Sequence, residues 1–254
     1  MVERLNSFCE KEAVAMAYQA VFKRYELKYL LDKEQKARIV EAIQKYMELD
    51  QYGKTTIRNI YFDTEDYRLI RRSIEKPLYK EKLRVRSYSN KKENDIVFVE
   101  LKKKYKKVVY KRRIGMSEEN AMKWLKEEME LENSSQIEKE ITYFLSYYKG
   151  LRPALFLSYD REAYFSKEQS DFRVTFDENV LCREQDFSLN SAAKGIPILG
   201  KNQVLMEIKC SGGIPLWMTE ILSSEKLYKT SFSKYGTAYR TIIYPRLKEM
   251  ETKR

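Results

Sequence analysis

The stretch Leu205-Met206-Glu207-Ile208-Lys209-Cys210 places a carboxylate and an ammonium group two residues apart, between apolar neighbours. The same spacing occurs at Glu26-Leu27-Lys28 and at Glu100-Leu101-Lys102. Successive side chains of a β-strand point to opposite faces, so each triplet puts its two charges side by side on one face. The pattern predicts amphipathic strands whose charged face meets either water or the inside of a charged barrel.

Further strand-like runs surround these triplets. They cover residues 23–30, 56–62, 82–88, 96–104, 107–114, 154–161, 172–177 and 204–210. The polar stretch 89–95 has the composition of a hairpin connection, which favours antiparallel neighbours. The fold class predicted is therefore α+β, with an antiparallel eight-stranded β-barrel and helices packed outside it.

The predicted helices lie between these strands. Asp32 is a good N-cap for a helix running to about Met47, and Ser117 and Ser135 precede two helices that form an insertion at about 117–149. Further helices follow Pro215 and span about 234–249. For residues 1–21 the sequence predicts a helical segment. For residues 22–250 it predicts a single domain, because no repeat or linker divides them.

Composition restricts the chemistry of the chain. Its 254 residues carry 49 Lys+Arg against 38 Asp+Glu, a formal charge of +11, which favours polyanionic partners. There is no histidine, so Ser-His and Cys-His nucleophile pairs and the usual zinc sites are excluded. Any reaction must use carboxylates, Lys, Arg, hydroxyl groups or a bound hard cation.

The cysteines and the apolar pattern indicate the compartment. Cys9, Cys182 and Cys210 are odd in number and widely spaced, which favours a reduced environment. The N-terminus has no apolar signal region, and no run approaches the ~20 apolar residues of a membrane span. We expect a cytoplasmic protein without a membrane span.

The phase of the cations distinguishes a barrel from a solvated sheet. Any single Lys or Arg would be interpreted as an exposed side chain. As a set, they occupy strand positions compatible with one shared interior: Lys28, Arg84, Arg86, Lys102, Lys111, Arg113, Arg161, Arg173 and Lys209. Such a cluster repels itself without an anion, and a chain of phosphates, whose oxygens Arg binds in pairs, is its natural occupant.

Three carboxylates lie among these cations. Glu26, Glu100 and Glu207 are either counterions of neighbouring Lys and Arg or ligands of a hard divalent cation. Mg²⁺ and Mn²⁺ take oxygen ligands and often join a single carboxylate to substrate phosphates. Glu207 is the ligand that we predict first.

A series of short motifs follows in order over about residues 22–244: Arg24-Tyr25-Glu26-Leu27-Lys28-Tyr29, Ile60-Tyr61-Phe62-Asp63-Thr64, Leu83-Arg84-Val85-Arg86, Phe98-Val99-Glu100-Leu101-Lys102, Ser158-Tyr159-Asp160-Arg161, Phe172-Arg173-Val174-Thr175-Phe176-Asp177, Met206-Glu207-Ile208-Lys209 and Ser231-Phe232-Ser233-Lys234-Tyr235. This series resembles the VTC domain, the polyphosphate polymerase branch of the triphosphate tunnel metalloenzymes. Its specificity lies in the order of the motifs.

The resemblance implies a tunnel enzyme that moves the terminal phosphoryl group of a nucleoside triphosphate, such as ATP, onto polyphosphate with Mn²⁺ or Mg²⁺. It implies that Lys234 lies beside the transferring group, together with Arg84 and Lys28, and that Glu207 holds the metal. Arg86, Lys102, Lys111, Arg161 and Arg173 would bind phosphates, and Lys209 and Arg113 join them by strand phase.

Two other functions compete with the polymerase. Many triphosphate-hydrolysing tunnel enzymes begin Glu-x-Glu-x-Lys, whereas Arg24 stands at the first of these positions, which disfavours a triphosphatase. A non-catalytic module for polyphosphate or nucleic acid is the other alternative. Binding of single strands needs exposed stacking aromatics. Tyr25, Tyr29, Tyr61 and Tyr110 are predicted on the face opposite the cations, so we expect no nucleic acid partner.

Overall fold

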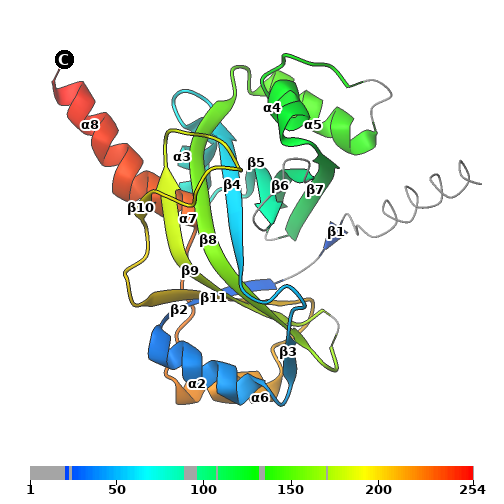
Figure 1. Cartoon of the computed structure of the whole chain (residues 1–254), viewed down its shortest axis with the longest axis vertical. Coiled ribbons are helices and arrows are strands. Elements are labelled where there is room, and N and C mark those ends of the chain that lie inside the picture. The colour runs from blue at the N-terminus through cyan, green and yellow to red at the C-terminus, as the bar shows by residue number, and fades with distance from the viewer. Residues whose placement is uncertain are drawn as a thin grey trace, which may run out of the picture.

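The computed structural model describes residues 21–22, 25–88, 96–106, 108–131, 135–169 and 171–253. Its centre is one strongly curled sheet in which all neighbouring strands are antiparallel (Figure 1). Eight strands follow one another across it in the order β7 (Val108–Met116), β6 (Val97–Tyr105), β5 (Tyr79–Tyr88), β4 (Thr55–Asp63), β8 (Arg152–Ser166), β9 (Arg173–Arg183), β11 (Gln203–Cys210) and β2 (Tyr25–Asp32). The predicted fold class is confirmed.

Short strands complete the sheet. β3 (Met47–Leu49) pairs with β8, and β10 (Ile196–Pro197) pairs with β9. β1 (Val21–Phe22) pairs with β7 at one end of the strand order, while β2, two residues further along the chain, pairs with β11 at the other end. Because so few residues separate β1 from β2 in the sequence, the two ends of the curled sheet lie close together.

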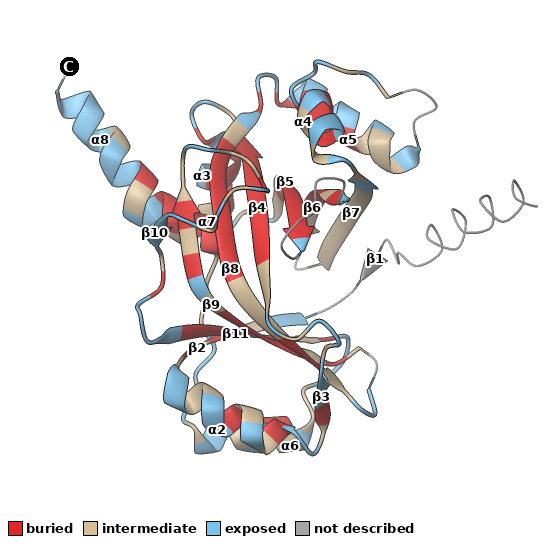
Figure 2. Ribbon diagram, viewed as in Figure 1, coloured by how far each residue is buried: buried red, intermediate tan, exposed pale blue. Residues whose placement is uncertain are grey.

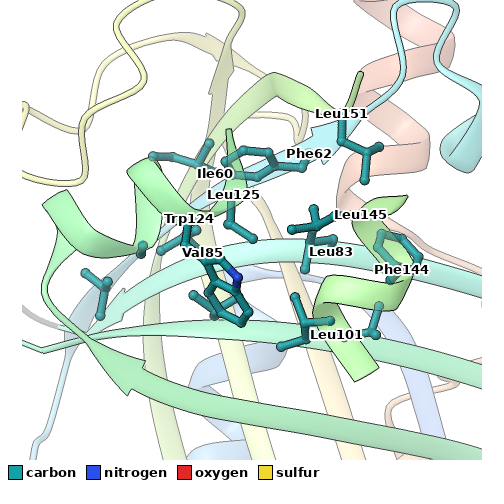
Figure 3. Close-up of a cluster of buried hydrophobic side chains, with 14 of the residues drawn as sticks. Ile60, Phe62, Leu83, Val85, Leu101, Trp124, Leu125, Phe144, Leu145 and Leu151 are labelled. Atoms are coloured by element: carbon teal, nitrogen blue, oxygen red, sulfur yellow. The ribbon is translucent and has the colours of Figure 1, made fainter. Parts of the chain in front are cut away.

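Helices cover the outer face of the sheet in two groups. α2 (Lys33–Ile43) and α6 (Leu216–Ser224) pack on β2, β9 and β11, with Ile39 and Met218 fully buried between them and the strands. α4 (Glu118–Leu125) and α5 (Gln136–Tyr147) pack on β5 and β6. Figure 3 shows Trp124 and Phe144 of these helices against Leu83 and Leu101 of the strands.

A third helical group packs at one end of the opposite, concave face of the sheet. α3 (Arg68–Ile74), α7 (Lys234–Ala238) and the π-helical turn η1 (Tyr239–Ile243) bury Tyr235 and Ala238 against Leu155 and Leu157 of β8 and Leu205 of β11. The strands are buried where these helices cover them (Figure 2). α8 (Tyr244–Thr252) then extends away from the sheet (Figure 1).

Local sequence signals account for most of the helix starts. Asp32, Ser117 and Ser135 cap their helices as predicted, and each side chain accepts a hydrogen bond from the backbone three residues on. The first helix ends at Ile43 rather than near Met47, which instead begins β3. The predicted N-terminal helix lies outside the described residues over 1–20, and Val21 belongs to β1; the connection 89–95 also lies outside them.

Within the described residues, no helix combines the length and apolar character needed to cross a membrane.

The outer core is expected to dominate stability. Trp124 of α4 is 3% exposed and belongs to the hydrophobic cluster between helices α4 and α5 and the sheet, whereas Tyr143 of α5 is 70% exposed. We expect Trp124→Ala to lower the free energy of unfolding in urea by about 3–5 kcal/mol, because it leaves a cavity. The matched Tyr143→Ala should change it by less than about 0.5 kcal/mol. Equal effects of the two substitutions would contradict this assignment of the core.

Candidate active site

Strand register places the predicted cations on one face of the sheet. Arg173, Lys209 and Glu26 oppose one another across β9, β11 and β2. Arg84, Glu100 and Arg113 do so across β5, β6 and β7. Because residues two apart in a strand share a face, the other predicted cations of these strands join the same surface: Lys28, Arg86, Lys102 and Lys111.

Contacts that skip a strand show that this face is the concave one. Arg86 Nη2 on β5 donates to Tyr159 Oη on β8 at 3.3 Å, across β4. Lys102 Nζ on β6 donates to Glu26 Oε1 on β2 at 3.1 Å. Neither pair belongs to adjacent strands, so the side chains converge on a common interior. We call this surface the inner face.

Glu207 lies at the centre of one cluster of the inner face. Its oxygens lie 3.2 Å from Lys28 Nζ, 3.4 Å from Lys234 Nζ and 3.5 Å from Arg161 Nη2, and Lys209 Nζ is 3.8 Å away. Burial alone would raise the pKa of Glu207, but Lys234, Lys28 and Lys209 outweigh it and hold the pKa well below its usual value. Glu207 is therefore ionised at neutral pH.

Lys234 enters this cluster from the start of α7. Ser233 caps that helix by accepting a hydrogen bond from Gly236 N, which fixes the turn that aims Lys234 at the sheet. Lys234 Nζ bonds to Asp177 Oδ2 on β9 and lies 4.5 Å from the centre of the Tyr159 ring. Despite the cost of burial, Asp177 and Glu207 raise the pKa of Lys234, so its ammonium stays charged.

Asp177 is a residue that the sequence analysis did not select. Its side chain is fully buried, and besides Lys234 it accepts hydrogen bonds from Arg161 Nε at 2.5 Å and Nη2 at 2.7 Å. Asp177 stands four residues after Arg173 in the run Phe172–Asp177, and side chains an even number of residues apart share a face of a strand. This even spacing was the sequence signal that could have placed Asp177 on the inner face.

Glu100 lies at the centre of a second cluster. Its side chain is 1% exposed, and it contacts four cations: Arg84 Nη2 at 2.6 Å, Lys111 Nζ at 2.7 Å, Arg113 Nε at 3.1 Å and Arg86 Nε at 3.9 Å. Burial would raise the pKa of Glu100, but Arg84 and Arg86 first among the four lower it well below its usual value. Glu100 thus acts as a shared counterion in this structure.

Glu26, Lys209 and Arg173, which oppose one another on neighbouring strands, complete the set of predicted residues on the inner face. The attraction of Lys102 lowers the pKa of Glu26 to about 2. Burial, partly opposed by Glu207, lowers the pKa of Lys209 to about 8. Arg173 Nη2 lies 3.4 Å from Asp50 Oδ2, and the Arg173 side chain is half-exposed.

The prediction for Tyr61 is wrong. Tyr61 opposes Arg84 on the neighbouring strand, and its hydroxyl accepts a hydrogen bond from Arg84 Nη1 at 3.1 Å, so it belongs to the inner face. The run Ile60-Tyr61-Phe62 is apolar on both faces, and its phase could not be read from polarity. Tyr61 packs on Tyr235 of α7, which explains why an aromatic ring stands there.

The carboxylates fit a divalent cation that is held together with phosphates. Glu207 and Asp177 both contact the Lys234 ammonium and offer hard oxygen ligands, the type that Mg²⁺ and Mn²⁺ require. The described residues contain no cluster of three or more Asp, Glu, Cys or His able to hold a metal, so Glu26, Glu100 and Glu207 do not form one ligand set. Substrate oxygens would have to complete the coordination.

The curled antiparallel sheet with a cationic inner face defines a triphosphate tunnel fold. A family model, the VTC domain, matches residues 23–243, and the chain belongs to this family. A comparison with curated protein sequences finds no match.

Solved structures share the fold. A Bacillus halodurans protein described as a candidate adenylate cyclase has a TM-score of 0.55 and 18% identity over 88% of this chain and 100% of its own. The Hippeastrum protein HpAC1, described as a candidate adenylyl cyclase with a dominant triphosphatase activity, has a TM-score of 0.51 and 14% identity over 85% of this chain and 94% of its own. At these identities the likeness concerns the fold.

The counterion role of Glu100 predicts a measurable stability loss. Glu100→Gln should lower the free energy of unfolding at pH 7 by about 3–5 kcal/mol, because it leaves buried cations without their carboxylate. Added tripolyphosphate should restore part of the loss by supplying negative charge. Urea titrations with and without the anion measure both effects, and an unchanged midpoint in the variant would contradict the role.

The same carboxylate predicts a pH dependence. The folded pKa of Glu100 lies below its usual 4.5, so its contribution is complete above about that pH and is lost as the pH falls through the folded value. The stability difference between wild type and Glu100→Gln should therefore narrow as the pH falls below about 4.5. Unfolding curves measured from pH 6 downward test this, and a constant difference would refute it.

Proposed function

We propose that the protein is a polyphosphate polymerase, which transfers the terminal phosphoryl group of a nucleoside triphosphate such as ATP onto a growing polyphosphate chain. The observation that carries this proposal is the surplus of Lys and Arg over carboxylates on the concave inner face, with Lys234 buried between Asp177 and Glu207. A chain of phosphates relieves this surplus. Membership of the VTC domain family supports the same substrate class.

Each cluster has a separate task in this reaction. Arg84, Arg86, Lys111 and Arg113 surround Glu100 with guanidinium and ammonium donors that can bind oxygens of the triphosphate. Lys28 and Lys234, 3.2 and 3.4 Å from Glu207, converge on the position proposed for the moving group. Phosphoryl transfer depends mainly on such placement and on positive charge around the phosphorus atom.

A divalent cation at Glu207 and Asp177 would neutralise charge on the triphosphate oxygens. Lys234, charged and buried between these carboxylates, is placed to bind a phosphate oxygen. Arg161 holds Asp177 in place through two hydrogen bonds.

The protonation states favour a phosphate acceptor over water. The oxygen of a polyphosphate chain is already ionised at neutral pH and needs no general base. The inner-face carboxylates Glu100, Asp177 and Glu207 have lowered pKa values and are weak bases. Lys209, with a pKa of about 8, gains negative neighbours when phosphates bind, which raises its pKa and keeps it charged.

Triphosphate hydrolysis is the second candidate function. The observation in its favour is the dominant triphosphatase activity named for the Hippeastrum protein, whose fold this chain shares. A module that binds polyphosphate without turning it over would use the same inner face. The two alternatives and the polymerase differ in their products.

Product analysis separates the three functions. We expect incubation with ATP and Mn²⁺ to yield long polyphosphate, seen as a ladder on a polyacrylamide gel. ADP and orthophosphate without any polymer would establish a triphosphatase, and unchanged ATP together with tight binding of polyphosphate would establish a binding module.

Substitutions on the inner face should abolish synthesis without unfolding the protein. We expect Lys234→Ala and Arg84→Ala each to lower the rate of polymer formation by about 10²–10³-fold, because each removes an electrostatic donor to the moving group. Lys123→Ala on α4 removes an exposed lysine that pairs only with Glu119 among the described residues, and should leave the rate unchanged. Wild-type rates in both inner-face variants would refute the assignment.

A further inference from the structure

The inner face continues past its last carboxylate along β5 and β6. Lys80 opposes Lys104, and Lys82 opposes Lys102, at the same two-residue spacing as Arg84 and Arg86. Within the described part of the chain, Lys80, Lys82 and Lys104 form no ion pair with a carboxylate, whereas Lys102 pairs with Glu26. These strands thus carry an extension of the inner face that is cationic and lacks counterions.

The extension is under electrostatic stress. Lys80, Lys82 and Lys104 are all half-buried. Burial, followed by the charges of Lys80 and Lys102, lowers the pKa of Lys82 to about 7, and burial and Lys104 lower that of Lys80. An anion laid across these groups would remove the repulsion and return them to full charge.

The extension leads directly to the proposed transfer position. Lys82 Nζ donates to Ser233 Oγ at 3.0 Å, and Ser233 precedes Lys234. Lys28 Nζ donates to the Phe232 carbonyl oxygen at 2.9 Å, from the other side of the same segment. The seven residues from Lys80 to Arg86 span about 20 Å at ~3.3 Å per step, which is long enough for several linked phosphates.

The chemistry of the extension favours a bare phosphate chain. From Lys80 to Arg84, every inner-face position of β5 is Lys or Arg, and the opposed positions Lys104, Lys102 and Glu100 of β6 are also charged. Single-stranded nucleic acid binds where cations alternate with stacking aromatic rings. Aromatic side chains stand only at the Arg84 and Arg86 end of this run, where Tyr61 and Phe98 oppose these arginines, and the paired positions Lys80–Lys104 and Lys82–Lys102 offer no aromatic ring to stack a base.

We propose that Lys80, Lys82 and Lys104 form a subsite for the acceptor polyphosphate, distinct from the triphosphate site around Glu100. The subsite rests on the proposed polymerase function and specifies which cations hold the chain that is being extended. Its occupant is an inorganic phosphate chain longer than a triphosphate, which enters along β5 and β6 and presents its end beside Lys234.

Calorimetric titration of the full chain with two inorganic ligands tests the subsite. We expect wild type to bind long-chain polyphosphate more tightly than tripolyphosphate. The double variant Lys80→Gln/Lys104→Gln should lose about tenfold or more in affinity for the long chain, because two charged contacts are removed. Its affinity for tripolyphosphate, which fits the site around Glu100, should change by less than about twofold.

Lys103→Gln is the matched control. Lys103 lies between Lys102 and Lys104 on β6 but faces outward, opposite Glu81 and Tyr110, and contacts Glu140 at 3.9 Å. It should leave both affinities unchanged. Tripolyphosphate binding also reports that each variant is folded.

Three results would overturn the subsite: no loss of long-chain affinity, an equal loss for both ligands, or an oligonucleotide that binds as tightly as polyphosphate and suffers the same loss. If the wild type makes polymer but the double variant binds both ligands as the wild type does, the subsite is overturned and the proposed function stands. The expected chain-length dependence in a protein that makes no polymer would overturn the proposed function and leave the subsite standing.

Discussion

Repulsion among the lysines and arginines of the inner face is the constraint on which the rest of the structure depends. Two like charges about 4 Å apart repel by about 4 kcal/mol near a protein surface. Glu100 and Glu207 offset part of this, because each stands among four cations within 4 Å. They hold the cations in place without neutralising them, and the remaining charge is available to a phosphorylated ligand.

The apolar packing makes this arrangement possible. Helices α2, α4, α5 and α6 bury the outward side chains of the strands, so the sheet is held from outside and its inner face is free to carry charge. α7 is the exception, since it packs at the inner end of the sheet and brings Lys234 to Asp177. A buried link from Tyr235 Oη to Asp63 Oδ2 at 2.9 Å ties α7 to β4 and so positions Lys234 indirectly.

Strand periodicity predicted the inner face because the period of two is local information. It placed Arg84, Lys102 and Lys209 on one surface, where the registers confirm them. It missed Asp177 and Lys82, whose importance depends on α7, a helix that reaches the sheet from far along the chain. Tyr61 was misplaced because the run Ile60-Tyr61-Phe62 is apolar on both faces, whereas the register with Arg84 and the packing on Tyr235 put Tyr61 on the inner face.

The most direct test of the account is a crystal structure with a non-hydrolysable ATP analogue and Mn²⁺. The account predicts phosphorus atoms on the inner face, with the terminal phosphate within hydrogen-bond reach of Lys28 and Lys234 and the others beside Arg84 and Arg86. A triphosphate bound on the outer, helix-covered surface, with the ion pairs of Glu100 and Glu207 undisturbed, would contradict it.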